Sequence, residues 1–296
     1  MNTDSIKAIN KINFKQSLMA YKKKPLSLLC KLIVWLAAII TIFALGYLIV
    51  YVLIKGVPHL TPELFAWEYN SDNVSIMPAI INTILMTLLS LLIAGPLGIF
   101  SAIYLVEYAK RGNKLVGIIR ITAETLTGIP SIVYGLFGML FFVTTLHMGY
   151  SLISGALTLA IMVLPVIMRT TEEALLAVPD SYREGSFGLG AGKLRTVFRV
   201  ILPSAMPGIL SGVILATGRI VGETAALIFT AGTVAKVPQG IFSSTRTLAV
   251  HMYSLSKEGL HTDQAYATAV VLLALVIIIN FISDAICSRK IDKDKE

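Results

Sequence analysis

The sequence predicts an all-α integral membrane protein with six transmembrane helices. Three observations lead to this prediction: the composition, a long uncharged run near the N-terminus, and the distribution of basic residues. Of the 296 residues, 55% are hydrophobic and only 14% are charged, and the mean hydropathy is +0.78. A soluble protein cannot bury so much apolar surface behind so few charges. The composition therefore also excludes a disordered chain and a coiled coil.

The first span is predicted over 32–54, a run of 23 residues without a charge. Such a run is long enough to cross ~30 Å of hydrocarbon as a helix. A signal peptide would need a shorter apolar stretch and a small-residue cleavage site, and residues 1–31 ahead of this run are polar and basic. We therefore expect an uncleaved first span behind an N-terminal tail.

Five further spans are predicted to form a core over 76–287, followed by a tail at 288–296. Several contain Gly or Pro, which membrane helices tolerate where neighbouring groups satisfy the freed backbone. The third also contains Arg120, Glu124 and a break at Gly128-Ile129-Pro130-Ser131. We expect these spans at Met77–Tyr104, Leu115–Leu146, Ser151–Met168, Ala205–Phe229 and Tyr266–Cys287.

Basic residues are divided unevenly among the segments outside these spans. The two tails, the loop after the second span and the loop at 169–204 hold 19 of the 25 Lys and Arg residues, and the alternate segments hold only four. Cytoplasmic segments carry such an excess, so both termini are predicted to be cytoplasmic. A nucleic-acid partner would need these charges on one face, and none is expected.

The loop at 169–204 is the longest predicted cytoplasmic segment. Pro179-Asp180-Ser181 indicates a helix start, and a helix of about two turns is expected to end near Gly190. A second short helix is expected next, with the chain returning to the membrane at Leu202-Pro203. Two interpretations follow: an amphipathic connector in the interface, or a docking element that passes force from a cytosolic partner into the spans.

The spacing in this loop resembles the EAA loop of ABC importer permeases, which reads Glu-Ala-Ala, three residues, Gly, nine residues, then Ile-x-Leu-Pro. This chain has Glu184-Gly185-Ser186, Gly190 and Val200-Ile201-Leu202-Pro203 in the same register. The resemblance implies the type I (MetI-like) ABC importer permease fold. It also implies that a cytosolic ATPase docks on this region, for which the matching residues are Glu184, Gly190, Leu202 and Pro203.

Segments 128–138 and 218–231 are similar to the phosphate-specific importer permeases, and to the PstA type more than the PstC type. The resemblance implies an importer of inorganic phosphate in which this chain forms half of the pore. It implies three partners: a PstC-like second permease, a PstB-like ATPase dimer and a PstS-like external phosphate-binding protein. ATP and magnesium would bind to the ATPase and no cofactor to this chain, whose segment 188–193 lacks the spacing of a Walker loop.

Arg219 and Glu223 are four residues apart in the predicted fifth span, which places them on one helical face. A mid-bilayer arginine costs ~2.5–3.5 kcal/mol, so it should face a partner or a wet cavity. Either the two residues form a structural pair, or they lie on the substrate path, where a guanidinium would match an oxyanion and Glu223 would weaken binding enough for release. Arg169 is expected to be either the exit-side counterpart or an ordinary positive-inside anchor.

Other functions stay open on the sequence alone. Within the same class, the chain could be the PstC-like subunit or import a related oxyanion. A stand-alone channel or secondary transporter would have no need of a docking loop. An enzyme is not expected, because the four histidines are scattered and no catalytic constellation is present.

Overall fold

The computed structural model describes residues 25–110 and 112–293, with side chains for 26–110 and 112–282. The chain divides into two compact units, Met1–Ile54 and Lys55–Glu296. The described part of the first unit, 25–54, lies entirely in helix α2 (Pro25–Gly56), which begins seven residues before the predicted span at 32–54. Residues 1–24 of the predicted N-terminal tail lie outside the described residues.

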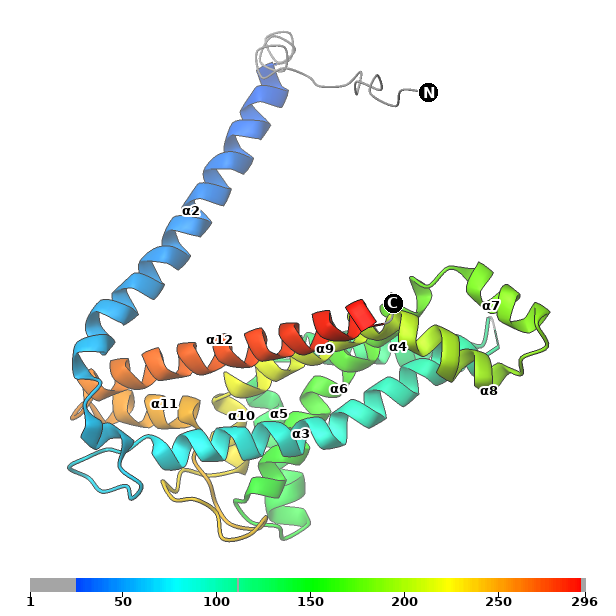
Figure 1. Ribbon diagram of the computed structural model, residues 1–296. Helices are drawn as coiled ribbons and strands as arrows, with labels where there is room; N and C mark the ends of the chain where they lie inside the picture. The colour runs from blue at the N-terminus through cyan, green and yellow to red at the C-terminus, as the bar shows by residue number, and fades with distance from the viewer. Residues whose placement is uncertain (1–24, 111, 294–296) are drawn as a thin grey trace. The chain divides into compact units, whose positions relative to one another are not determined.

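The second unit is built around three long helices that pack side by side, α3 (Met77–Ile103), α6 (Leu152–Leu176) and α9 (Leu202–Val221) (Figure 1). Large apolar side chains fill the space between them; Met86, Leu159, Ile167 and Ile220 are almost completely buried. Glycines bring α9 close to α6, because a Cβ at Gly208 would approach Ala174 and one at Gly212 would approach Thr170. The small residues of α9 thus serve packing within this chain.

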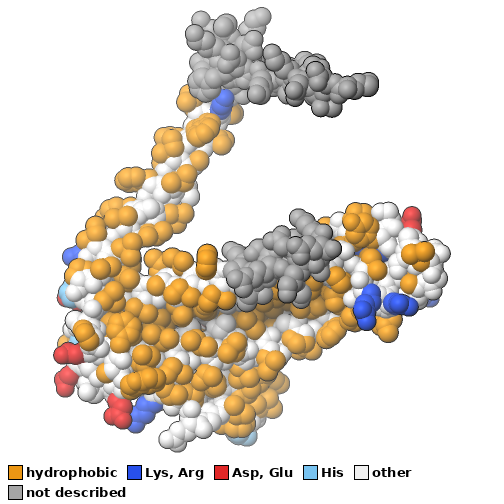
Figure 2. Space-filling view, viewed as in Figure 1, with side chains coloured by type: hydrophobic (Ala, Val, Ile, Leu, Met, Phe, Trp, Pro, Cys, Tyr) orange, Lys and Arg blue, Asp and Glu red, His pale blue; other side chains and the backbone are white. Residues whose placement is uncertain are grey.

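The two ends of this unit carry different shorter elements (Figure 1). At one end are η1 (Val57–His59), η2 (Pro62–Phe65) and α11 (Leu248–Glu258), which packs on α12 (Thr262–Lys293). At the other end, called here the α7 end, lie η3 (Tyr104–Tyr108), α7 (Asp180–Gly188) and α8 (Lys193–Thr196). Hydrophobic side chains cover most of the visible surface between the ends (Figure 2).

The predicted third span over 115–146 is broken at 128–131, where the sequence predicted a break. The segment forms α4 (Lys114–Thr127) and α5 (Ser131–Gly138), which continues as the π-helical η4 (Met139–Thr145). The two halves are bent by 102°. Gly128 caps α4, and Pro130 restricts the residue before it to extended backbone, so the helix ends there.

The prediction of a fifth span over 205–229 is wrong at both ends. The helix stops at Val221, and a separate helix α10 (Ala225–Thr230) follows after Gly222. At its start, α8 and the π-helical η5 (Val197–Ile201) run without a break into α9, giving 29 continuous residues from Lys193. The predicted second short helix is therefore part of this long one. A π-turn shifts the hydrogen-bond register, which accommodates the missing N–H of Pro203.

Five helices of the described residues are long and apolar enough to cross a membrane, and there are six if the bent α4–α5 segment counts as one span. They are Leu26–His59, Met77–Tyr108, Leu152–Leu176, Lys193–Val221 and Thr262–Ile282.

Candidate functional site

Helix α7 carries the centre of the predicted docking motif at the α7 end (Figure 2). None of its residues is buried, and Glu184 is exposed. Gly190 follows with φ +81°, a left-handed conformation that favours glycine and stops the helix. Leu189 between them is 91% exposed. The helix and its C-cap therefore present a carboxylate and an apolar side chain to solvent, and Glu184 has no ion pair or side-chain hydrogen bond with another described residue.

Leu202 and Pro203, the other residues of the motif, lie at the start of α9 directly after η5. Leu202 is half-buried against the apolar cluster at the base of α7, and Pro203 is exposed. A hydrogen bond of 2.8 Å between the hydroxyls of Ser186 and Thr196 joins α7 to α8. The motif thus spans the projecting helix and the beginning of the long helix behind it.

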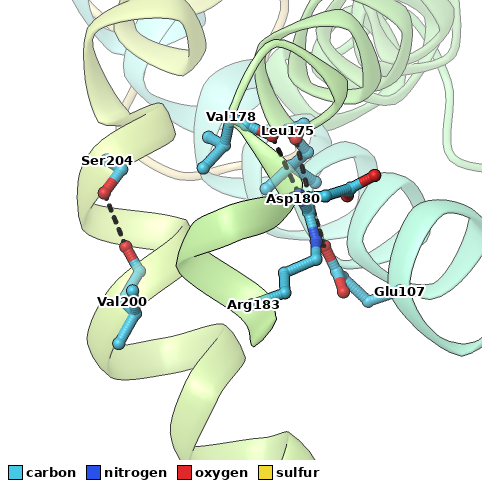
Figure 3. Close-up of polar contacts among 7 residues, drawn as sticks. All are labelled: Glu107, Leu175, Val178, Asp180, Arg183, Val200 and Ser204. Carbon is cyan, nitrogen blue, oxygen red and sulfur yellow. Dashed lines mark hydrogen bonds and ion pairs between the residues drawn. The ribbon is translucent and has the colours of Figure 1, made fainter. Parts of the chain in front are cut away.

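Arg183, which the sequence analysis did not single out, makes the densest set of polar contacts at the α7 end (Figure 3). Its guanidinium donates to Glu107 Oε1 at 2.8 and 3.1 Å, and Asp180 accepts at 3.2 Å. It also donates to the carbonyls of Leu175 (3.0 Å) and Val178 (2.9 Å). Only 16% of the Arg183 side chain and 7% of the Glu107 side chain are exposed.

A second group of ion pairs joins α4 to α6. Arg120 pairs with Glu172 at 2.5 Å, and Arg169 pairs with Glu124 at 3.0 Å and with Glu173 at 3.2 Å. All five side chains line a pocket of about 260 Å³ between the two helices. Arg169, a predicted path residue, is thus held by two carboxylates in this conformation.

Arg219 and Glu223 do not share a helical face, because α9 ends between them at Val221. No ion pair or side-chain hydrogen bond joins Arg219 to another described residue, although its charge interacts with the Tyr134 hydroxyl. Glu223 is 9% exposed, and its Oε1 accepts the N–H of Ala226 at 3.1 Å, which caps α10. The expectation that Arg219 and Glu223 share one helical face is therefore wrong. Glu223 caps α10 and does not pair with the positive charge of Arg219.

Two helix breaks lie near Arg219: the bend between α4 and α5 at 128–131, and the break between α9 and α10 at 222–224. A Cβ at Gly135 would lie 2.8 Å from Ala226, so α5 and α10 touch backbone to backbone. The Tyr134 hydroxyl donates to the carbonyl of Leu126, close to the α4–α5 bend, at 2.8 Å. Interrupted helices at membrane depth occur where the backbone is buried in protein or lines a water-filled path. A permanently charged guanidinium beside such a junction is suited to meet an anion.

Within the described residues, no group of His, Cys, Asp and Glu has the arrangement of a metal site.

Known proteins are similar to this chain in sequence. A family model described as "Binding-protein-dependent transport system inner membrane component" matches residues 94–293. The chain is 37% identical over 262 residues to the probable ABC transporter permease protein YqgI of Bacillus subtilis (strain 168), covering 82% of this chain and 88% of that protein. It is 33% identical over 259 residues to the phosphate transport system permease protein PstA of Pasteurella multocida (strain Pm70), covering 83% and 89%.

Solved structures share the fold. A chain of the bacterial alginate ABC transporter aligns with a TM-score of 0.65 at 14% identity, covering 91% of this chain and 97% of that one. A chain of the inward-facing MetNI methionine ABC transporter aligns with a TM-score of 0.56 at 20% identity, covering 73% and 94%. These likenesses confirm the predicted type I importer permease fold.

Proposed function

This chain belongs to the family of binding-protein-dependent transport system inner membrane components, and we propose that it is the PstA-type permease of an ATP-driven importer of inorganic phosphate. As an ABC importer permease it spans the membrane, is not itself an enzyme, and works with a partner ATPase and a binding protein. We propose a PstB-like ATPase dimer, a PstS-like phosphate-binding protein and a PstC-like second permease. Similarity to curated PstA proteins over most of the chain supports this choice.

The setting of Arg219 is the single observation that carries the phosphate assignment. A hydrated oxyanion needs a permanently charged, bidentate donor along its path. Arg219 lies where two helix breaks meet, without a carboxylate partner among the described residues. Arg169, held by Glu124 and Glu173, is proposed as the exit-side residue, where carboxylates competing for the guanidinium would keep phosphate from being trapped.

The α7 end is proposed to face the cytoplasm, with both termini on that side. Four of the five basic residues of the loop at 169–204 lie on α7, α8 and η5, which agrees with the positive-inside bias. In this orientation the exposed Glu184 and Leu189 would meet the ATPase, and ATP and magnesium would bind there.

Purification from native membranes in mild detergent, followed by reconstitution, tests the proposal. An ATPase and a second permease should co-purify, and the proteoliposomes should accumulate phosphate only with ATP and the external binding protein. Uptake without ATP would instead favour a channel or secondary transporter. ATP-dependent uptake of another oxyanion in place of phosphate would support the proposed importer but contradict phosphate as its substrate.

A further inference from the structure

Helix α7 has little apolar anchorage of its own. None of its residues is buried, and on one side it borders a pocket of about 780 Å³ whose walls include Glu107, Asp180 and Phe187. Apart from the Arg183 contacts, the side-chain hydrogen bond that ties α7 to another described element is the one between Ser186 and Thr196. The position of α7 therefore depends strongly on Arg183.

The Arg183 guanidinium joins three parts of the fold (Figure 3). It starts on α7, reaches Glu107 in η3 at the end of α3, and donates to the Leu175 carbonyl in the last turn of α6 and to the Val178 carbonyl beyond it. A guanidinium can do this because its five N–H donors form a rigid planar fork, which a lysine lacks. Glu107 belongs to a π-helical turn, an irregularity found frequently at functional positions.

We propose that Arg183 is a positioning residue for transport: it fixes α7 to α3 and α6, so that a displacement of α7 moves these two helices together. The inference rests on the proposed function, since it concerns how ATPase motion would reach the spans. α3 and α6 form the most extensive helix pair of the chain, so a link to both would carry motion into the core. Without it, α7 would tilt against the neighbouring pocket and the motion would be lost.

The burial of Glu107 and Arg183 strengthens the ion pair that joins η3 to α7. Glu107 and Arg183 are both largely withdrawn from solvent, so removing one leaves the other as an uncompensated buried charge. Asp180 contributes less, because its side chain is 70% exposed and exposed pairs are weak. Glu107 and the two carbonyls are therefore the contacts that matter.

The test uses the complete reconstituted importer and measures phosphate uptake and ATP hydrolysis on the same preparation. Arg183→Met should retain the ATPase subunit and hydrolyse ATP, while the phosphate moved per ATP falls about tenfold. Arg183→Lys should give an intermediate ratio, because lysine can pair with Glu107 but cannot reach both carbonyls. Arg199→Met is the matched control: it removes an exposed arginine for which no ion pair exists among the described residues, and it should keep the wild-type ratio.

A purely structural role predicts a different pattern, in which uptake and ATP hydrolysis fall together with the amount of complex and the ratio stays constant. That result, or a wild-type ratio in Arg183→Met, would overturn the proposal. If Arg183→Met fails to assemble, Glu107→Gln decides, because glutamine keeps the shape and loses the charge; its ratio should also fall.

Covalent rescue provides a second readout. In a variant with cysteines only at 107 and 183, a short bis-methanethiosulfonate cross-linker, which forms a disulfide with each thiol and releases methanesulfinate, should restore the ratio lost by the two substitutions, and an unchanged ratio after complete cross-linking would contradict a mechanical link. The wild-type complex separates this inference from the proposed function. If wild type itself shows no ATP-dependent uptake, the proposed function fails; if it does and the variants keep its ratio, only the role of Arg183 fails.

Discussion

The arginines at the α7 end and the arginine at the α9–α10 break differ in their partners. Arg120, Arg169 and Arg183 each pair with at least one carboxylate from another helical element. Arg219 pairs with none among the described residues, because the nearest carboxylate in sequence, Glu223, caps α10 instead. A guanidinium whose charge is already matched holds helices together, whereas an unmatched one is available to an incoming anion.

Arg219→Gln is expected to have the largest effect. It removes the charge proposed to meet phosphate while keeping a polar side chain, and uptake per assembled complex should fall about 100-fold, as when a key oxyanion donor is lost. Complex yield and basal ATP hydrolysis should stay near wild type. Uptake at the wild-type rate would place Arg219 in packing and remove the distinction between the two regions.

Glu184→Lys should uncouple the importer at the docking helix. Reversing an exposed charge at an interface creates repulsion against the partner, and uptake should fall about tenfold with the spans still inserted. The exposed Lys257 of α11, at the opposite end of the unit, offers a charge-reversal control as Lys257→Glu. Equal uptake by Glu184→Lys and wild type would remove the docking role.

Arg120→Gln applies to a paired arginine the same substitution as Arg219→Gln. It leaves Glu172, whose side chain is 10% exposed, without its partner. Because Arg120 is about half exposed, we expect a loss of about 1 kcal/mol in stability and a melting temperature lower by about 3 °C. Uptake per assembled complex should change little. A large loss of uptake with an unchanged melting temperature would contradict the structural role given to this pair.

Glu223→Ala should destabilise the start of α10 by about 1 kcal/mol, the usual cost of losing a side-chain cap. Glu223→Gln keeps a carbonyl oxygen that can accept the Ala226 N–H, so its melting temperature should stay near wild type. Equal destabilisation by both variants would show that the negative charge matters, and would restore the predicted pairing with Arg219.

His251, at the end of the unit away from α7, gives an effect that depends on pH. Its ring is buried, and burial, followed by the charge of Arg246, lowers the pKa of His251 from 6.5 to about 4. Arg246 and His251 both contact the Tyr69 ring. The unfolded chain binds a proton more readily, so stability is complete above pH 6.5 and declines as pH falls towards 4.

Between pH 7 and 5.5 this group should cost about 1 kcal/mol, measured as a fall in melting temperature. The fall should be smaller in His251→Gln, which has no proton to gain at this position. Identical pH profiles for the variant and wild type would contradict the pKa assigned to His251.

Much of the fold follows from properties that act locally along the chain. Apolar runs long enough to span a bilayer, and Gly and Pro at the breaks, predicted every membrane segment and the position of the bend at 128–131. The bend angle of 102° was not predictable, because Gly and Pro also occur in straight membrane helices. The end of α9 was missed because Gly222-Glu223-Thr224 interrupts the apolar run for only three residues, too few to indicate a loop between two helices.

The site was less predictable because it depends on contacts between distant residues. Glu184 and Gly190 were predicted as docking residues from their spacing, which lies within one segment of the chain. Arg183 was missed because Glu107 lies 76 residues away, and an arginine in a polar loop is accounted for by the positive-inside bias. The prediction placed Glu223 beside Arg219 because it assumed one continuous helix. In the structure α9 ends at Val221, and Glu223 caps α10 instead.

Chemical restoration of charge at position 219 tests the central distinction most directly. Arg219→Cys, in a chain whose two native cysteines are replaced by serine, should import little phosphate. A water-soluble aminoethyl methanethiosulfonate reagent should react with the thiol, restore a positive charge and recover uptake, and phosphate should slow the reaction; an uncharged reagent of similar size should not recover uptake. A thiol that stays unreactive in the assembled importer, or equal recovery with both reagents, would contradict a guanidinium exposed to a passing anion.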